Sequence, residues 1–168
     1  KDFLNGAKIA YETIITDFTN GNLKNIKLLL DKNLKKKLTL LDIGAADGAN
    51  NKWNIINNNI NIILVEPHKE SAKKLKSNGF NVIESVLNSE DDKEIKFYNT
   101  KKPLCSSFYK PNFGHLEKFS NAERFNIVSE DIFVSKSLDT EIKNFDQPNF
   151  IKIDTEGSEL DILKGSNK

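Results

Sequence analysis

The stretch Leu38–Asn50 constrains the fold of this chain more than any other part of it. The apolar run from Leu38 to Ile43 indicates a strand buried on both faces, as strands of parallel sheets are. Gly44 and Gly48 then permit a sharp turn and a close approach of the backbone to a ligand. The segment after Gly48 can begin a helix, whose first N–H groups are unpaired. Strand, glycine loop and helix start together indicate a cradle for a nucleotide-type cofactor.

The spacing within this stretch discriminates among cofactors. A dinucleotide-binding loop has the pattern G-x-G-x-x-G, whereas here Asp42, Gly44, Ala46 and Gly48 occupy alternate positions and Asn51 stands where the third glycine would be. A buried carboxylate is costly, so Asp42 is expected to have a hydrogen-bond partner. It suits a cationic ligand better than a pyrophosphate, and S-adenosylmethionine carries an ammonium and a sulfonium. The alternative is an ordinary strand-to-helix turn with two structural glycines.

Composition excludes several classes of protein. The chain has 168 residues and a formal net charge of +1, which fits one globular domain and argues against a nucleic-acid partner. Cys105 is the single cysteine, so a disulfide framework is excluded and a cytoplasmic location is expected. No apolar run approaches the ~20 residues that span a bilayer. Because the sequence opens on Lys1 and contains no Met, we expect the natural protein to start earlier.

Strands and helices alternate along most of the chain, which predicts an α/β fold with parallel strands flanked by helices. Two N-terminal helices are expected within residues 1–37, packing on or capping the core of a domain that spans 38–168. The predicted strands after the glycine loop are 61–65, 80–87 and 149–153, the last of them buried. The predicted helices are 50–59, 69–77, one beginning at Ser137 with Ser137 and Thr140 as its cap, and one at the C-terminal end.

The alternation breaks over about 94–134, where strands are expected at 94–98 and 127–134 with an irregular segment between them. We interpret this stretch as an antiparallel insertion over the cofactor pocket, because long loops in compact domains often bind ligands. Its candidate substrate contacts are Cys105, Ser106, Ser107, Phe108, Tyr109 and His115. A structural hairpin without such a role is the open alternative.

Polar residues follow the predicted strands. Glu66 and Pro67 end the second strand, about 20 residues beyond the glycine loop, where a carboxylate can accept hydrogen bonds from ribose hydroxyls. The alternative for Glu66 is a solvated strand end. Glu84 and Ser85 lie near the end of the third strand, where the adenine would be, although Glu84 is equally well explained as an ordinary polar strand position.

A dense group of carboxylates follows the strand at 149–153. Ser158 and Asp161 fit a capping box for the last helix, and Glu159 then supplies first-turn charge. That interpretation leaves Asp154 and Glu156 unexplained. Catalytic residues of open α/β sheets gather at such strand ends, so Asp154 is the candidate general base and Glu156 would orient it or bind substrate. His68 and His115 are weaker candidates for the base.

Taken together, these blocks resemble the FkbM family of S-adenosylmethionine-dependent methyltransferases over about residues 38–165. The matching segments are 41–48, 65–67, 137–139, 151–159 and 163–165, and they occur in the family's order. The Lys-Ile-Asp-Thr-Glu-Gly-Ser-Glu segment that begins at Lys152 is the most specific of them. The family often has Asn where this chain has Ala46, so one polar cofactor contact is expected to be missing or replaced by Asp47.

The resemblance implies a Rossmann-like class I methyltransferase sheet, and it implies that the family's further C-terminal strands are missing after Lys168. It implies S-adenosylmethionine as cofactor and O-methylation of a sugar or small metabolite. The alternatives are a non-catalytic binding module of this fold and, less favoured, a nicotinamide-dependent oxidoreductase. No resident metal is predicted, although two carboxylates could hold a divalent ion. The predicted cofactor-binding residues are Asp42, Gly44, Ala45, Ala46, Asp47, Gly48, Glu66, Pro67, Glu84 and Ser85.

Overall fold

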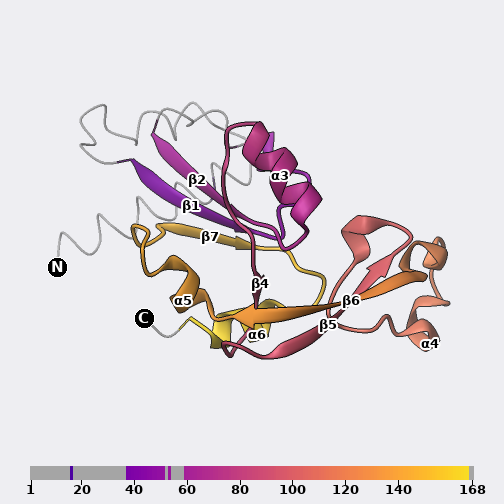
Figure 1. Ribbon diagram of the computed structural model, residues 1–168. Coiled ribbons are helices and arrows are strands. Elements are labelled where there is room, and N and C mark those ends of the chain that lie inside the picture. The colour runs from indigo at the N-terminus through magenta and orange to yellow at the C-terminus, as the bar shows by residue number, and fades with distance from the viewer. Residues whose placement is uncertain (1–15, 17–36, 52, 54–58, 167–168) are drawn as a thin grey trace. The chain divides into compact units, whose positions relative to one another are not determined.

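A computed structural model describes residues 16, 37–51, 53 and 59–166 (Figure 1). The helices predicted within residues 1–37 lie almost entirely outside these residues, and residues 52 and 54–58 of the helix predicted at 50–59 also lie outside them. The chain divides into two compact units, of which the larger contains Thr39–Ala49 and Ile62–Lys168. The helices and strands described below belong to this larger unit. The exceptions are Leu38, the first residue of one strand, and Ile60 and Asn61, the first two residues of another.

The main sheet has four parallel strands, which confirms the predicted fold class. They are β1 (Leu38–Ile43), β2 (Ile60–Val65), β3 (Asn81–Ile83) and β7 (Phe150–Ile153). Their order is β3-β2-β1-β7 (Figure 1). The chain therefore runs outward from β1 to β3 and later returns to the other side of β1. Open α/β sheets bind ligands at the carboxyl ends of their strands, next to such a reversal.

Helices pack on both faces of this sheet. Helix α3 (Lys69–Ser77) has the predicted bounds and buries Leu75 beside Leu64 of β2. Helices α5 (Leu138–Ile142) and α6 (Glu159–Lys164) place Leu138 and Ile162 in a separate core cluster with alternate strand residues. Because successive strand residues point to opposite faces, the two clusters lie on opposite sides of the sheet.

A second sheet joins β4 (Val86–Leu87), β6 (Ile127–Lys136) and β5 (Glu94–Thr100), in that order. Strands β5 and β6 pair in antiparallel fashion, as predicted for this part of the chain. Between them lie the short helices η2 (Pro103–Cys105), α4 (Phe113–Leu116) and η3 (Ala122–Phe125). Figure 1 shows these helices at one end of the β5–β6 ribbon.

Two predicted strands differ from the structure. The strand predicted at 80–87 breaks at residues 84 and 85, because its first half pairs with β2 and its second half with β6. Both halves are buried in part, so their apolar pattern does not reveal the change of sheet. Strand β7 was expected to be buried, but it is an edge strand of the described sheet and Ile151 is 42% exposed.

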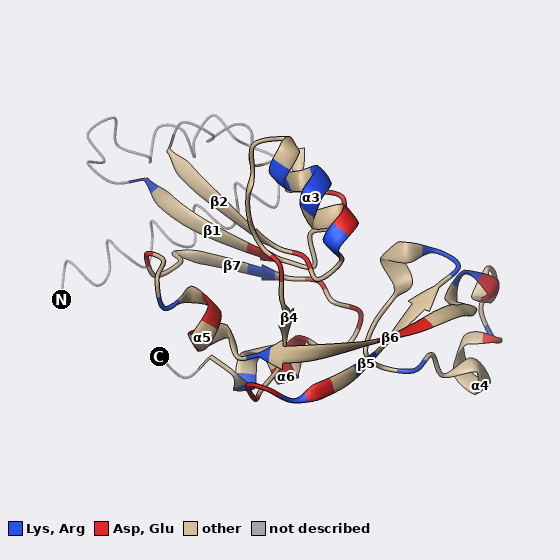
Figure 2. Ribbon diagram, viewed as in Figure 1, with Lys and Arg blue, Asp and Glu red and all other residues tan. Residues whose placement is uncertain are grey.

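The β1–β7 pair carries a buried charge. Figure 2 shows a basic segment of β7 beside an acidic segment of β1. Asp42 and Lys152 are register partners, and Lys152 Nζ lies 3.0 Å from Asp42 Oδ1. Within the described part of the chain, Oδ1 has no partner in hydrogen-bond geometry, although the Lys152 ammonium lies close to it. Burial raises the pKa of Asp42 above its usual value, and Lys152 opposes that rise. Lys152 therefore compensates the buried charge of Asp42.

The end of β1 also fits closely against the end of β7. Asp154 N donates to Ile43 O at 3.0 Å. Gly44 follows with φ of 80°, and a Cβ at Gly44 would overlap the carbonyl oxygen of Asp154. The close backbone approach that the sequence predicts at Gly44 is thus to Asp154, another part of the chain. Gly48 also has a positive φ of 86°, but a Cβ there would meet only Leu75 Cδ2, at 3.4 Å.

This difference predicts unequal effects of two alanine substitutions. Gly48→Ala should lower the free energy of unfolding by about 1–2 kcal/mol, the cost of a side chain in the left-handed region. Gly44→Ala adds the overlap with the Asp154 backbone, so its loss should be about 3 kcal/mol or more. Urea unfolding followed by circular dichroism measures both values. Equal losses would contradict the packing of Gly44 against Asp154.

The Asp42–Lys152 pair predicts a pH-dependent effect of Lys152→Met. Because its folded pKa is raised, Asp42 favours the folded state most below its ordinary value of 3.8, and this contribution is lost as pH rises through the folded pKa. Removing Lys152 raises that pKa further. Lys152→Met should therefore cost about 1–3 kcal/mol at neutral pH and less in acid, a smaller loss than breaking a fully buried pair because Lys152 is partly solvated.

The control is the double variant Asp42→Asn/Lys152→Met, which carries no buried charge. At neutral pH the free energy of unfolding of this double variant should be higher than that of Lys152→Met and close to that of the wild type. It should also vary less with pH. A loss in Lys152→Met that stays constant between neutral and acidic pH would show that the ion pair does not cause it.

Candidate functional site

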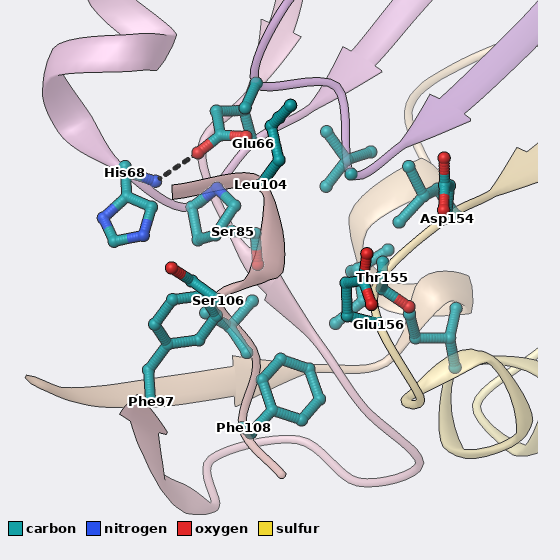
Figure 3. Close-up of a pocket in the computed structure, with 18 of the residues that line it drawn as sticks. Glu66, His68, Ser85, Phe97, Leu104, Ser106, Phe108, Asp154, Thr155 and Glu156 are labelled. Atoms are coloured by element: carbon teal, nitrogen blue, oxygen red, sulfur yellow. Dashed lines mark hydrogen bonds between the residues drawn. The ribbon is translucent and has the colours of Figure 1, made fainter. Parts of the chain in front are cut away.

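A cavity opens at the carboxyl ends of β1, β2 and β7. Its volume is about 100 Å³, several times the roughly 10–15 Å³ that holds one water molecule. Two polypeptide walls face each other across it in Figure 3, one with Glu66 and His68 and the other with Asp154, Thr155 and Glu156. The lining residues are Ile43, Gly44, Ala46, Val65, Glu66, Pro67, His68, Ser85, Val86, Leu87, Phe97, Pro103, Leu104, Ser106, Phe108, Asp154, Thr155, Glu156 and Ile162.

Glu66 is the buried carboxylate of this cavity. It follows the last residue of β2, is 2% exposed, and accepts a hydrogen bond from His68 N at 3.0 Å through Oε1 (Figure 3). Its own N donates to Ile83 O at 3.0 Å, which fixes the end of β2 against β3. Burial raises the pKa of Glu66, and the His68 N–H opposes that rise. A carboxylate held in this way is an acceptor for a ligand that brings hydroxyl donors.

The glycine loop forms the floor next to Glu66. Gly44 N and Ala45 N donate to Val65 O at 3.1 and 3.4 Å, so the loop is tied to the end of β2. Gly44 and Ala46 line the cavity. Ala45 is buried in the core, and the exposed Asp47 and the glycine Gly48 are not among the lining residues.

Asp42 lies beneath the cavity rather than in its wall. Neighbouring residues of a strand point to opposite faces, and Ile43 is the residue of β1 that faces the cavity. Asp42 instead faces Lys152, whose Nζ also lies 3.5 Å from Asp154 Oδ2. One ammonium therefore links the buried Asp42 to Asp154, a carboxylate of the cavity wall.

The loop after β7 presents Asp154 and Glu156. The Asp154 side chain is 70% exposed. Glu156 has φ of 54°, a left-handed conformation, and Ser107 Oγ donates to its carbonyl oxygen at 2.9 Å. Glu159 Oε1 accepts hydrogen bonds from Thr155 N and Gly157 N at 3.0 and 3.2 Å. Burial alone would raise the pKa of Glu159, but these backbone hydrogen bonds lower it, so its carboxylate holds the loop in place.

The predicted capping box at α6 is wrong. Ser158 is the N-cap residue, but its side chain caps no backbone N–H. Asp161 makes a short hydrogen bond with the Tyr109 hydroxyl instead of reaching back to the helix start, and this contact lowers the pKa of Asp161. Glu159, expected to be a plain first-turn charge, organises the preceding loop.

Some of the remaining predicted site residues line the main cavity and others lie outside it. Ser85 and Ser106 line the cavity. Glu84 is outside it and pairs with Lys76, whose Nζ lies 3.1 Å from Glu84 Oε2. Ser107 and His115 line a separate cavity of about 230 Å³, to which Glu156 also contributes.

The main cavity has an aromatic wall, of which Phe108 was a predicted substrate contact and Phe97 was not predicted from the sequence. Phe97 and Phe108 line it from β5 and the following segment, and their ring centroids are 6.1 Å apart. The His68 ring packs edge-on against Phe97 at 5.0 Å and Phe133 at 5.8 Å. The inward alternation of Ile95 and Phe97 along β5 is the one sequence signal that marks this face.

No group of three or more His, Cys, Asp and Glu side chains within the described ranges is arranged to hold a metal ion. None of the helices in that part of the chain has the length and apolar character needed to cross a membrane.

Comparison with known proteins identifies the family. The model described as Methyltransferase FkbM domain matches residues 42–168. No curated protein and no solved structure matches the chain. The family match contains the glycine loop, the strand end at Glu66 and the loop at Asp154, which are the segments that form the cavity. It also covers well over half of the chain, so this protein belongs to the FkbM family of methyltransferases.

Proposed function

We propose that this methyltransferase transfers the methyl group of S-adenosylmethionine to a hydroxyl of a sugar or small metabolite. The observation that carries the proposal is the placement of a buried carboxylate, Glu66, and an exposed one, Asp154, on facing walls of one cavity. The buried group suits the ribose of a nucleoside, and the exposed group suits an acceptor that arrives from solvent.

The residues present fit this cofactor. Glu66 offers a desolvated carboxylate to ribose hydroxyls, and the apolar residues Val86 and Leu87 line the cavity beside Ser85. Asp42 Oδ1 is buried without a hydrogen-bond partner among the described residues, next to the glycine loop. When bound, S-adenosylmethionine supplies an electrophilic methyl group on a sulfonium. Glu66, Gly44 and Ala46 would hold it.

The chain's own residues then act on the acceptor. A hydroxyl is a weak nucleophile, so a base near it must accept its proton. Asp154 is placed for this role at the end of β7, and Lys152 Nζ lies 3.5 Å from its Oδ2. Glu156, on the same loop, would accept a second hydrogen bond from the acceptor. The segment of about 94–134 contributes Phe97, Leu104 and Phe108 to the wall and would restrict water around the reacting groups.

Calorimetry with S-adenosylhomocysteine tests the cofactor. Glu66→Gln replaces a charged acceptor by a neutral amide, so we expect affinity to fall roughly 10- to 100-fold, from the strength of hydrogen bonds to charged groups. The matched control is Glu84→Gln, which removes an exposed carboxylate outside the cavity and should leave affinity unchanged. NAD should not bind. Preferential binding of NAD, or equal effects of the two variants, would contradict the proposed cofactor site.

Turnover of Asp154→Asn tests the base. We expect kcat for transfer of a labelled methyl group to fall about 10²- to 10⁴-fold, the usual contribution of general base catalysis, while affinity for S-adenosylhomocysteine stays nearly unchanged. Asp131→Asn, on the exposed face of β6, is the matched control and should retain activity. Full activity of Asp154→Asn would exclude Asp154 as the base, and no transfer by the wild type to any hydroxyl acceptor would favour a non-catalytic binding module.

A further inference from the structure

A second polar cavity adjoins the proposed reaction site. Its volume is about 280 Å³, and it shares Leu104, Asp154 and Glu156 with the first cavity. Its other lining residues are Lys102, Cys105, Arg124 and Phe125. Two cations on the insertion therefore line the same space as the two carboxylates of the β7–α6 loop.

The backbone holds the two cationic residues together. Lys102 N donates to Arg124 O at 3.0 Å, and the neighbouring Lys101 N donates to Asn126 O at 2.8 Å. Thr100, which is 3% exposed, donates from Oγ1 to Lys102 O at 2.7 Å. The Arg124 guanidinium lies 4.9 Å from the centroid of the Phe125 ring, which restricts its orientation. Lys102 and Arg124 are therefore presented from a constrained turn.

Their charges are available to a ligand. No described carboxylate forms an ion pair with Lys102 or Arg124, whereas Lys96 and Lys136 each have one and Lys152 has two. Asp154 already has Lys152 as its partner, and the Glu156 side chain makes no ion pair with any described residue. Cations and hydrogen-bond acceptors thus face one cavity without neutralising each other.

We propose that this cavity is the acceptor subsite and that the acceptor is a hydroxylated compound that carries an anionic group, a carboxylate or a phosphate. The proposal rests on the proposed function, since it assigns the acceptor class to the same reaction site. The anionic group would bind Lys102 and Arg124, because a guanidinium matches the two oxygens of a carboxylate or phosphate. Hydroxyls of the same molecule would donate to Glu156 and Asp154.

A neutral sugar would match the two carboxylates of this cavity better than its two cations. Its hydroxyls could donate to the carboxylates and accept from the cations, but it would bring no opposite charge to Lys102 and Arg124. A nucleic acid is disfavoured as acceptor, because its many phosphates call for an extended basic surface and the chain carries a net charge of only +1. The mixed lining therefore favours a small acid with several hydroxyls.

Binding measurements on the chain saturated with S-adenosylhomocysteine test the proposal. Glucuronate and glucose 6-phosphate are compared with glucose by calorimetry or saturation-transfer NMR. At least one of the two anionic sugars should bind about tenfold more tightly than glucose, and its affinity should fall as salt is added. Tighter binding of glucuronate would identify the anionic group as a carboxylate, and tighter binding of glucose 6-phosphate would identify it as a phosphate.

The variant Lys102→Gln/Arg124→Gln should lose this preference, with a fall of about tenfold or more in affinity for the anionic sugar and unchanged affinity for S-adenosylhomocysteine. The matched control is Lys118→Gln, an exposed lysine of the same insertion outside both cavities. The proposal would be overturned if glucose and the anionic sugars bound equally or if neither anionic sugar bound. It would also be overturned if Lys102→Gln/Arg124→Gln and Lys118→Gln had equal effects on affinity for the anionic sugar. Failure of S-adenosylhomocysteine to bind would instead overturn the proposed function, whereas equal binding of glucose and the anionic sugars in its presence would overturn only the acceptor subsite.

Discussion

The pairing of β1 with β7 is the constraint on which the site depends. It places Asp42 opposite Lys152 and brings the backbone of Asp154 so close to Gly44 that no side chain fits there. The consequences are electrostatic as well as steric, since one ammonium compensates a buried carboxylate and approaches an exposed one. The strand ends that carry the glycine loop and the candidate base are therefore fixed relative to each other before any ligand binds. A site preorganised in this way needs little rearrangement to orient reactants.

The insertion supplies what the main sheet lacks. The sheet offers acceptors and backbone at its strand ends, whereas β5 and the following segment offer aromatic surface and cations. Contacts that join these parts include the hydrogen bond from Ser107 to the carbonyl oxygen of Glu156 and the packing of His68 against Phe97. Because Glu156 holds a left-handed backbone conformation, an unusual one for a residue with a side chain, the Ser107 contact links the shape of the insertion to the position of a carboxylate in the wall.

Local patterns allowed the sheet and one helix to be predicted, but contacts between distant segments did not follow from them. The strand at Leu38–Ile43 and the helix at Lys69–Ser77 have the predicted bounds, because each carries its own apolar period and its own glycine or asparagine stop. The break after Ile83 could not be predicted from the sequence, because apolar residues occur both in β3 of the main sheet and in β4 of the second sheet. Glu159 was misread because a sequence pattern does not show whether a carboxylate faces the helix or the preceding loop. The cations opposite Asp154 come from an irregular segment whose course only the tertiary structure gives.

The most direct measurement of the central claim is a crystal structure of the chain with S-adenosylhomocysteine. The account predicts that the ribose hydroxyls bind the Glu66 carboxylate, that the amino-acid end lies over the glycine loop, and that the sulfur faces the side of the cavity with Asp154. A nucleoside seated on another surface, or one in this cavity with its ribose away from Glu66, would contradict the account.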